Sequence, residues 1–241
     1  MNKLYKNDKF WIAAGADHTF NCFKLMGGDC SVEVVASMLE SAILNKENEV
    51  EPPHKHVQML VDAWLEIRRM ALEKGEQMEN ENIDFPDFTV EEFKQLYLIL
   101  NPDASLYDLF SNTSCNNDVY TEFTQIFNAV KNINNLEELI HELSIFINSN
   151  NIKGTFGKNT QLVSWFYIQL TLILKGFSPI ISFVERYQEM LETFPATNLL
   201  YGEIIMTQKD SWIKGENFNY ITNHWIRVSK EYLEHIEKNY V

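Results

Sequence analysis

Apolar residues recur along most of the chain at steps of three and four positions, the spacing of one face of an α-helix. Val35, Leu39 and Ile43 form the first clear case, with Ser31 in front of them as the expected cap. Alternation with a period of two, which is typical of half-buried strands, is rare. The pattern predicts helices over 32–43, 54–74, 90–100, 119–131, 136–148, 160–175, 180–193 and 219–238.

Local signals mark several of the predicted helix ends. Thr89 and Glu92 have the spacing of a capping box, in which each residue satisfies a backbone N–H of the other. Gly75 and Gly176 are expected to end the helices that precede them. The helix over 160–175 carries so many apolar residues that we expect it to be buried.

The first thirty residues give no clean period. They mix aromatic residues with Gly15, Gly27 and Gly28, so residues 1–30 are predicted to be irregular or to form a short β-hairpin. No internal repeat, low-complexity tract or linker interrupts the rest. The sequence therefore predicts one helical domain over 1–241, with C-terminal helices over 191–241.

Composition supports an all-α fold and narrows the class of partner. The chain has 241 residues, of which 45% are hydrophobic, and only 9 Gly and 6 Pro. It can therefore bury a sizeable core, and strand-and-turn architectures are disfavoured. The net charge is −14. Nucleic acid is not expected as a partner, because affinity for its backbone comes from clustered Lys and Arg.

Cysteine usage and the apolar runs predict a cytoplasmic protein. Cys22, Cys30 and Cys115 are odd in number and lack CxxC spacing, which suggests reduced thiols rather than disulfides or a zinc site. Residues 1–11 contain no apolar stretch of the kind found in signal peptides. The longest apolar run, 162–174, is interrupted by polar residues and is too short to span a bilayer, so no membrane partner is expected.

No complete catalytic, nucleotide or metal motif occurs in the sequence. His54 and His56 form the closest histidine pair, but two imidazoles do not complete a metal shell and no third ligand accompanies them. We interpret them as exposed residues near a helix start. Neither a metal site nor a cofactor is predicted.

One stretch carries more information. Residues 154–162 read Gly-Thr-Phe-Gly-Lys-Asn-Thr-Gln-Leu, and the apolar helix that follows them leads into Gly-Phe-Ser-Pro-Ile at 176–180. This order resembles the core of the Fic (filamentation induced by cAMP) family, in which HxFx(D/E)GNGRxxR opens a central helix and GxPPI follows it. In this register Phe156, Gly176 and Pro179 fall on the Phe, Gly and Pro of the motif. The resemblance implies a Fic-like helical core over 31–190.

The resemblance also implies that the chemistry of the family is lost. In the family a His acts as base, an acidic residue holds Mg²⁺, and a Gly-Asn-Gly turn with two Arg binds phosphates. Here Gly154 replaces the His and Lys158 replaces the acid. Asn-Thr-Gln at 159–161 replaces the turn, and Leu162 and Trp165 replace the two Arg. None of these side chains can take over the role, so no catalytic residue is predicted.

A weaker similarity lies upstream. The stretch 40–45, Glu-Ser-Ala-Ile-Leu-Asn, resembles the inhibitory helix motif [S/T]xxxE(G/N) of some Fic proteins, with its Ser/Thr and Glu replaced. Both members of the inhibitory Glu–Arg pair would then be absent.

These observations predict a catalytically degenerate Fic-like protein that acts by binding a protein partner. Two alternatives stay open. The chain is a divergent Fic-like transferase of nucleotidyl or phosphoryl groups if Lys158, Asn159 and Thr160 receive an anion at the helix start. It is an acidic interaction or inhibitor protein if its surface charge selects a basic partner.

Overall fold

The computed structural model describes residues 3–46, 50–102, 125–156 and 159–239, and these residues form helices with no strand among them. The prediction of an all-α fold is confirmed. None of the described helices is both long and apolar enough to cross a membrane. The elements are η1 (Leu4–Lys6), α1 (Asp8–Leu25), α2 (Val32–Leu44), α3 (Lys55–Glu81), α4 (Val90–Leu100), a helical segment at 125–130, α7 (Leu136–Lys153), α8 (Thr160–Leu174), η3 (Val184–Arg186), α9 (Gln188–Glu192), α10 (Phe194–Met206), α11 (Lys209–Trp212) and α12 (Glu216–Asn239).

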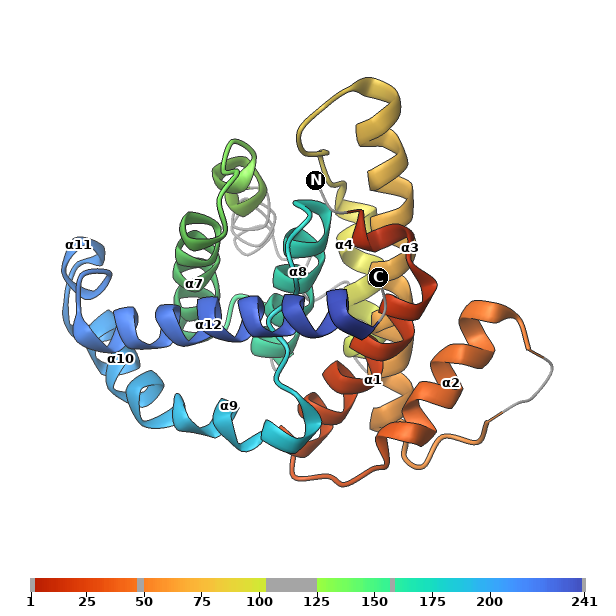
Figure 1. Cartoon of the computed structure of the whole chain (residues 1–241). Helices are drawn as coiled ribbons and strands as arrows, with labels where there is room; N and C mark the ends of the chain where they lie inside the picture. The colour runs from red at the N-terminus through yellow and green to blue at the C-terminus, as the bar shows by residue number, and fades with distance from the viewer. Residues whose placement is uncertain (1–2, 47–49, 103–124, 157–158, 240–241) are drawn as a thin grey trace.

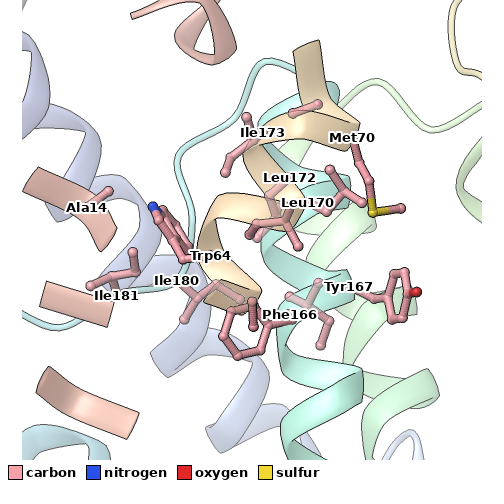
Figure 2. Packing of buried hydrophobic residues seen from close by; sticks show 14 of the residues in the cluster. Ala14, Trp64, Met70, Phe166, Tyr167, Leu170, Leu172, Ile173, Ile180 and Ile181 are labelled. Atoms are coloured by element: carbon pink, nitrogen blue, oxygen red, sulfur yellow. The ribbon is translucent and has the colours of Figure 1, made fainter. Parts of the chain in front are cut away.

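Helix α8 lies at the centre of the molecule, with α7 on one side and α3 and α4 on the other (Figure 1). Twelve of its 15 residues are buried, as expected for a helix with no polar face. Figure 2 shows Phe166, Leu170 and Ile173 of α8 among side chains of α3, α1 and the segment after α8. The prediction of a buried helix over 160–175 is therefore confirmed.

Helix α12 crosses α7 and α8 and reaches α1 (Figure 1). Near its C-terminal end the Tyr232 hydroxyl donates a 2.7 Å hydrogen bond to the Asp17 carboxylate on α1. Near its start it packs with α7, α10 and α11 in a second apolar cluster, made of Ile145, Leu200, Trp212, Phe218 and Ile221. The C-terminal helices are thus fixed to the rest of the protein at both ends of α12.

The chain between α8 and η3 is extended rather than helical, and side chains of other helices fix it in place. The buried amide of Gln169 donates to the carbonyl oxygen of Ile180 at 3.1 Å and accepts from its backbone N–H at 2.8 Å. Ser229 on α12 donates to the carbonyl oxygen of Ser178, at 2.7 Å. Asn21 on α1 donates to the carbonyl oxygen of Ser182, at 2.6 Å. The segment 178–182 therefore obtains its buried hydrogen bonds from three separate helices.

The prediction of an irregular or hairpin N-terminus was wrong, because residues 8–25 form helix α1. Eleven of its 18 residues are buried, and it contacts α2, α3 and η1, so its apolar residues do not lie on one stripe. Gly15 lies where the ring of Trp64 crosses the helix, and a Cβ atom there would be 2.3 Å from the Trp64 Nε1. The glycine that suggested a loop is instead a point of close helix packing.

Two other helix boundaries were also wrong for packing reasons. Gly75 does not end α3, which continues to Glu81; a Cβ atom at Gly75 would be 2.4 Å from the ring of Tyr5. The helix predicted over 180–193 is reduced to η3 and α9, because the hydrogen bonds of Gln169 hold its first residues extended. The helix α10 over 194–206 was not predicted. Of the helix predicted over 119–131, residues 119–124 lie outside the described residues.

His18 is the most strongly perturbed histidine among the described residues. Its side chain is 2% exposed and lies between the rings of Trp64 and Phe166, with ring centroids 5.0 and 4.8 Å away. Burial lowers the pKa of His18 to about 3, because the charged imidazolium would lose its hydration there. The folded protein therefore keeps His18 neutral throughout the physiological range.

The hydrogen bonds of Gln169 give a first prediction about stability. Gln169→Leu keeps most of the side-chain volume but leaves the backbone N–H and C=O of Ile180 buried without partners. We expect the free energy of unfolding to fall by roughly 2–5 kcal/mol, the cost of two unsatisfied buried groups. Urea denaturation checks this, with Gln161→Leu as control, since Gln161 is an exposed glutamine on the same helix. Equal losses for the two variants would contradict the assignment.

The burial of His18 gives a second prediction, about pH. Its folded pKa lies below the ordinary 6.5, so the unfolded chain takes up a proton first and acid favours unfolding. The stability that depends on neutral His18 is fully present above pH 6.5. It is lost progressively as the pH falls towards 3, and the loss in unfolding free energy is roughly 2 kcal/mol at pH 5. His18→Phe should therefore flatten the unfolding free energy between pH 7 and 5. Parallel pH profiles for the two proteins would refute this account.

Candidate functional site

The loop between α7 and α8 is held in place by local hydrogen bonds and by one buried aromatic ring. Helix α7 ends at Gly154, whose φ of 61° is left-handed and suits glycine. Two residues later the ring of Phe156 is fully buried, with ring centroids 5.3 Å from Phe93 and 6.3 Å from Phe146. The backbone N–H of Phe156 donates to the Thr160 hydroxyl at 3.0 Å, which joins the loop to the first turn of α8.

Asn159 ties the other end of this loop to helix α4. Its amide Nδ2 donates to the carbonyl oxygen of Leu100 at 2.8 Å and to Oδ1 of Asn101 at 2.9 Å. Asn101 is buried and donates in turn to the carbonyl oxygen of Tyr97 at 3.1 Å. The start of α8 is therefore fixed relative to the end of α4.

A pocket of about 320 Å³ opens beside the start of α8. Its wall is built from α1, α7, α8, the segment 178–182, α9, α10 and α12, so it collects residues that are far apart in the sequence. Apart from one histidine and one cysteine, the side chains are apolar, amide, hydroxyl or aromatic. The lining consists of Cys22, Leu25, Met26, Ile147, Asn148, Asn151, Asn159, Gln161, Leu162, Trp165, Ile180, Ser182, Met190, Thr193, Phe194, Thr197, Tyr201, His224, Trp225 and Val228.

The titratable groups of this lining are all uncharged near pH 7. Burial raises the pKa of the Cys22 thiol to about 12, and burial raises the pKa of Tyr201. The pKa of His224 is lowered, first by burial and then by the neighbouring Arg227, whose guanidinium lies 3.3 Å from the His224 Nδ1. The described wall therefore presents no net charge to a ligand.

Two polar atoms of the wall lack a hydrogen-bond partner within the described part of the chain. These are Oδ1 of Asn151 and Oγ of Ser182, and both are buried. The Asn151 amide donates through Nδ2 to the Tyr201 hydroxyl at 3.1 Å, which fixes the direction of its oxygen. Buried polar groups are nearly always paired, so these two atoms are exceptions among the residues of the wall.

Two aromatic rings and one aliphatic side chain form the apolar part of the wall next to the loop. The rings of Trp165 and Trp225 meet edge to face, with centroids 5.2 Å apart. Leu162 lies one turn before Trp165 on α8. Leu162 and Trp165 occupy the positions where the Fic-like register would place the two phosphate-binding Arg. These two positions therefore line one pocket, and both present apolar side chains to it.

The structure gives the other predicted site residues distinct places. Lys158 lies outside the described residues. The side-chain amide of Asn159 donates to residues at the end of α4. The Thr160 hydroxyl is buried and accepts from the backbone of the loop. Binding of an anion by these residues stays a prediction. The side chain of Phe156 is buried in the core. Gly176 lies just after α8 and has a left-handed φ of 76°. Pro179 belongs to the extended segment 178–182.

Sequence analysis missed most of the pocket. Ser182, Tyr201 and His224 belong to no motif, and only their position in the fold brings them to one cavity. The stretch 40–45, which resembles an inhibitory helix, lies at the end of α2 and contributes no residue to the wall. Within the described residues no group of three or more His, Cys, Asp or Glu could hold a metal ion. The His54 and His56 rings lie 4.8 Å apart, with His54 capping α3.

The left-handed turn at Gly154 leads to a prediction about the position that the register equates with the catalytic His. Gly154→Ala should lower the free energy of unfolding by about 1 kcal/mol, because a Cβ atom is strained at this φ. Gly154→Asn should cost less, since Asn tolerates this conformation. Gly202→Ala is the control and should raise the free energy of unfolding instead. Gly202 is helical, and a Cβ atom there meets nothing within 4 Å. Chemical denaturation measures all three.

The pocket has the chemistry of a binding site for an uncharged group. Its wall offers aromatic and aliphatic surface together with amide and hydroxyl side chains. Such a site selects by shape and hydrogen bonding rather than by charge. No protein-family model, no curated protein and no solved structure matches the chain.

Proposed function

We propose that this chain is a binding protein with a Fic-like helical core and without nucleotidyl-transfer activity. Its pocket beside the 154–161 loop receives an uncharged, mostly apolar side chain of a protein partner. The observation that carries this proposal is the absence of charge from the described wall of that pocket.

The composition of the wall argues against transfer of a charged phosphoryl or nucleotidyl group. Phosphate binding relies on Arg, Lys, metal ions or backbone N–H groups that offset its negative charge. The described lining contains no Lys or Arg, and Leu162 and Trp165 contribute apolar surface next to the start of α8. At the position of the family's base, Gly154 has no side chain that could accept a proton. The described side chains of this pocket would therefore not offset the hydration that a triphosphate loses on entering it.

The size of the pocket and its surroundings favour a protein partner. A volume of about 320 Å³ is at the lower end of small-molecule sites and is sufficient for one large side chain. Three apolar residues of the lining are also exposed to solvent: Leu25 at 37%, Met26 at 47% and Phe194 at 45%. Apolar surface next to a cavity is typical of protein-binding sites.

The indole N–H signals of the protein's tryptophans provide the test. We expect N-acetyl-phenylalaninamide and N-acetyl-leucinamide at millimolar concentration to shift the NMR signals of Trp165 and Trp225. The signals of Trp11 and Trp64 should not move, because these indoles are buried and donate to the backbone oxygens of Tyr5 and Trp11, at 2.8 and 2.9 Å. N-acetyl-aspartate amide, which carries a charge, should leave all four signals unchanged.

A pair of variants ties these shifts to the pocket. Thr197→Phe should fill the cavity and remove the response, because Thr197 lines it. Thr207→Phe is the matched control, since Thr207 is exposed at the end of the same helix. Shifts of Trp165 and Trp225 with ATP and Mg²⁺, lost in the Thr197 variant, would instead support a transferase with an altered loop. Shifts that persist in that variant would place binding outside the pocket.

A further inference from the structure

Helix α10 carries the three most exposed large apolar side chains of the described chain. Met206 is 83% exposed, Ile205 is 68% and Leu199 is 62%. Leu200, on the opposite side of α10, is fully buried against α12 and α7. Helix α10 is therefore apolar on two sides, and the described residues cover only one of them.

The uncovered side of α10 is also free of charge along its whole length. Residues at helical steps of three and four on this side are Pro195, Asn198, Leu199, Gly202, Ile205 and Met206. This is unusual for exposed surface in a chain with a net charge of −14. Two copies would repel each other over most of their surface, and this side is a place where they can approach.

No contact among the described residues explains why position 202 is a glycine. It lies inside α10, its backbone is not left-handed, and a Cβ atom there would meet nothing within 4 Å. A glycine in a helix interior is destabilising relative to alanine. Gly15 and Gly75, in contrast, are filled by the rings of Trp64 and Tyr5. Gly202 therefore leaves an open hollow on the apolar side, of the kind that lets a second helix come close.

We propose that a second copy of this chain packs on this side, with the two α10 helices antiparallel and a two-fold axis at Gly202. Leu199 precedes Gly202 by three residues and Ile205 follows it by three. Antiparallel packing about Gly202 therefore places Leu199 of each copy on Ile205 of the other. The surface is self-complementary, as a two-fold interface requires.

The charges at the two ends of the α9–α10 region fit this arrangement. Glu192 is exposed just before α10 and Lys209 is exposed just after it. In an antiparallel pair the beginning of one helix lies near the end of the other, so each Glu192 comes near Lys209 of the second copy. Parallel packing would bring the two Glu192 carboxylates together, which disfavours it. Lys209 has an exposed acidic neighbour, Asp210, in either arrangement.

The contact area predicts how tightly the two copies associate. Helix α10 has 13 residues and is about 20 Å long, so one helix face buries less than the roughly 1,200 Å² of a standard stable interface. We therefore expect a dimer that forms with rising protein concentration and dissociates on dilution. This dimer does not depend on the proposed function, because Thr197 and Tyr201 face the pocket while Leu199 and Ile205 do not line it.

Analytical ultracentrifugation of the full chain, from low micromolar to near-millimolar protein, tests the proposal. Wild-type protein should show a monomer–dimer equilibrium, and Ile205→Glu should raise the dimer dissociation constant at least about tenfold. Leu44→Glu is the matched control, because Leu44 is a 44% exposed leucine on α2. Melting temperatures show that the variants are folded. A wild-type protein that stays monomeric, or a dimer equally tolerant of both variants, would overturn the proposal.

A charge exchange tests the antiparallel orientation. Glu192→Lys and Lys209→Glu should each weaken the dimer about two- to fivefold, the effect of one exposed pair per end. The double variant should recover the wild-type dissociation constant, because each pair is restored with reversed polarity. Additive weakening in the double variant would exclude the antiparallel arrangement.

Discussion

The side-chain amide of Gln169 forms two hydrogen bonds with the backbone of Ile180, and the arrangement of the C-terminal half follows from them. A glutamine inside an apolar helix is costly unless both ends of its amide are paired. Here the backbone of an extended segment provides both partners, so the chain leaves α8 along the side of the helix. Segment 178–182 can then form one wall of the pocket, and α9 and α10 continue from it.

The pocket exists because several helices end or cross at the same place as this segment. Asn21 of α1 and Ser229 of α12 add hydrogen bonds to its backbone, so three helices and the segment depend on one another. The loop after α7 is fixed independently, through Phe156 in the core and Asn159 at the end of α4. The walls of the pocket are therefore positioned by buried contacts.

Sequence reasoning succeeded where one helix has one covered face. The capping box of Thr89 and Glu92 is present, and the helix over 219–238 lies within α12. It failed for α1, because neighbours cover several sides of that helix and its apolar residues show no helical period. It also failed for 180–183, because hydrogen bonds from Gln169, eleven residues before Ile180, hold the backbone extended. The pocket was out of reach for a similar reason: Ser182, Tyr201 and His224 share no spacing, and only long-range packing brings them together.

The glycines inside helices show how the same residue type carries different information once the fold is known. Gly15 and Gly75 each look like a helix break in the sequence, yet the rings of Trp64 and Tyr5 occupy the space that a side chain would need. Their cost to helix stability is offset by closer packing within the chain. Gly202 bears the same cost, and no side chain of the described chain uses its space. The proposed dimer would supply this compensation, because the uncharged apolar side on which Gly202 lies suits another helix of the same chemistry.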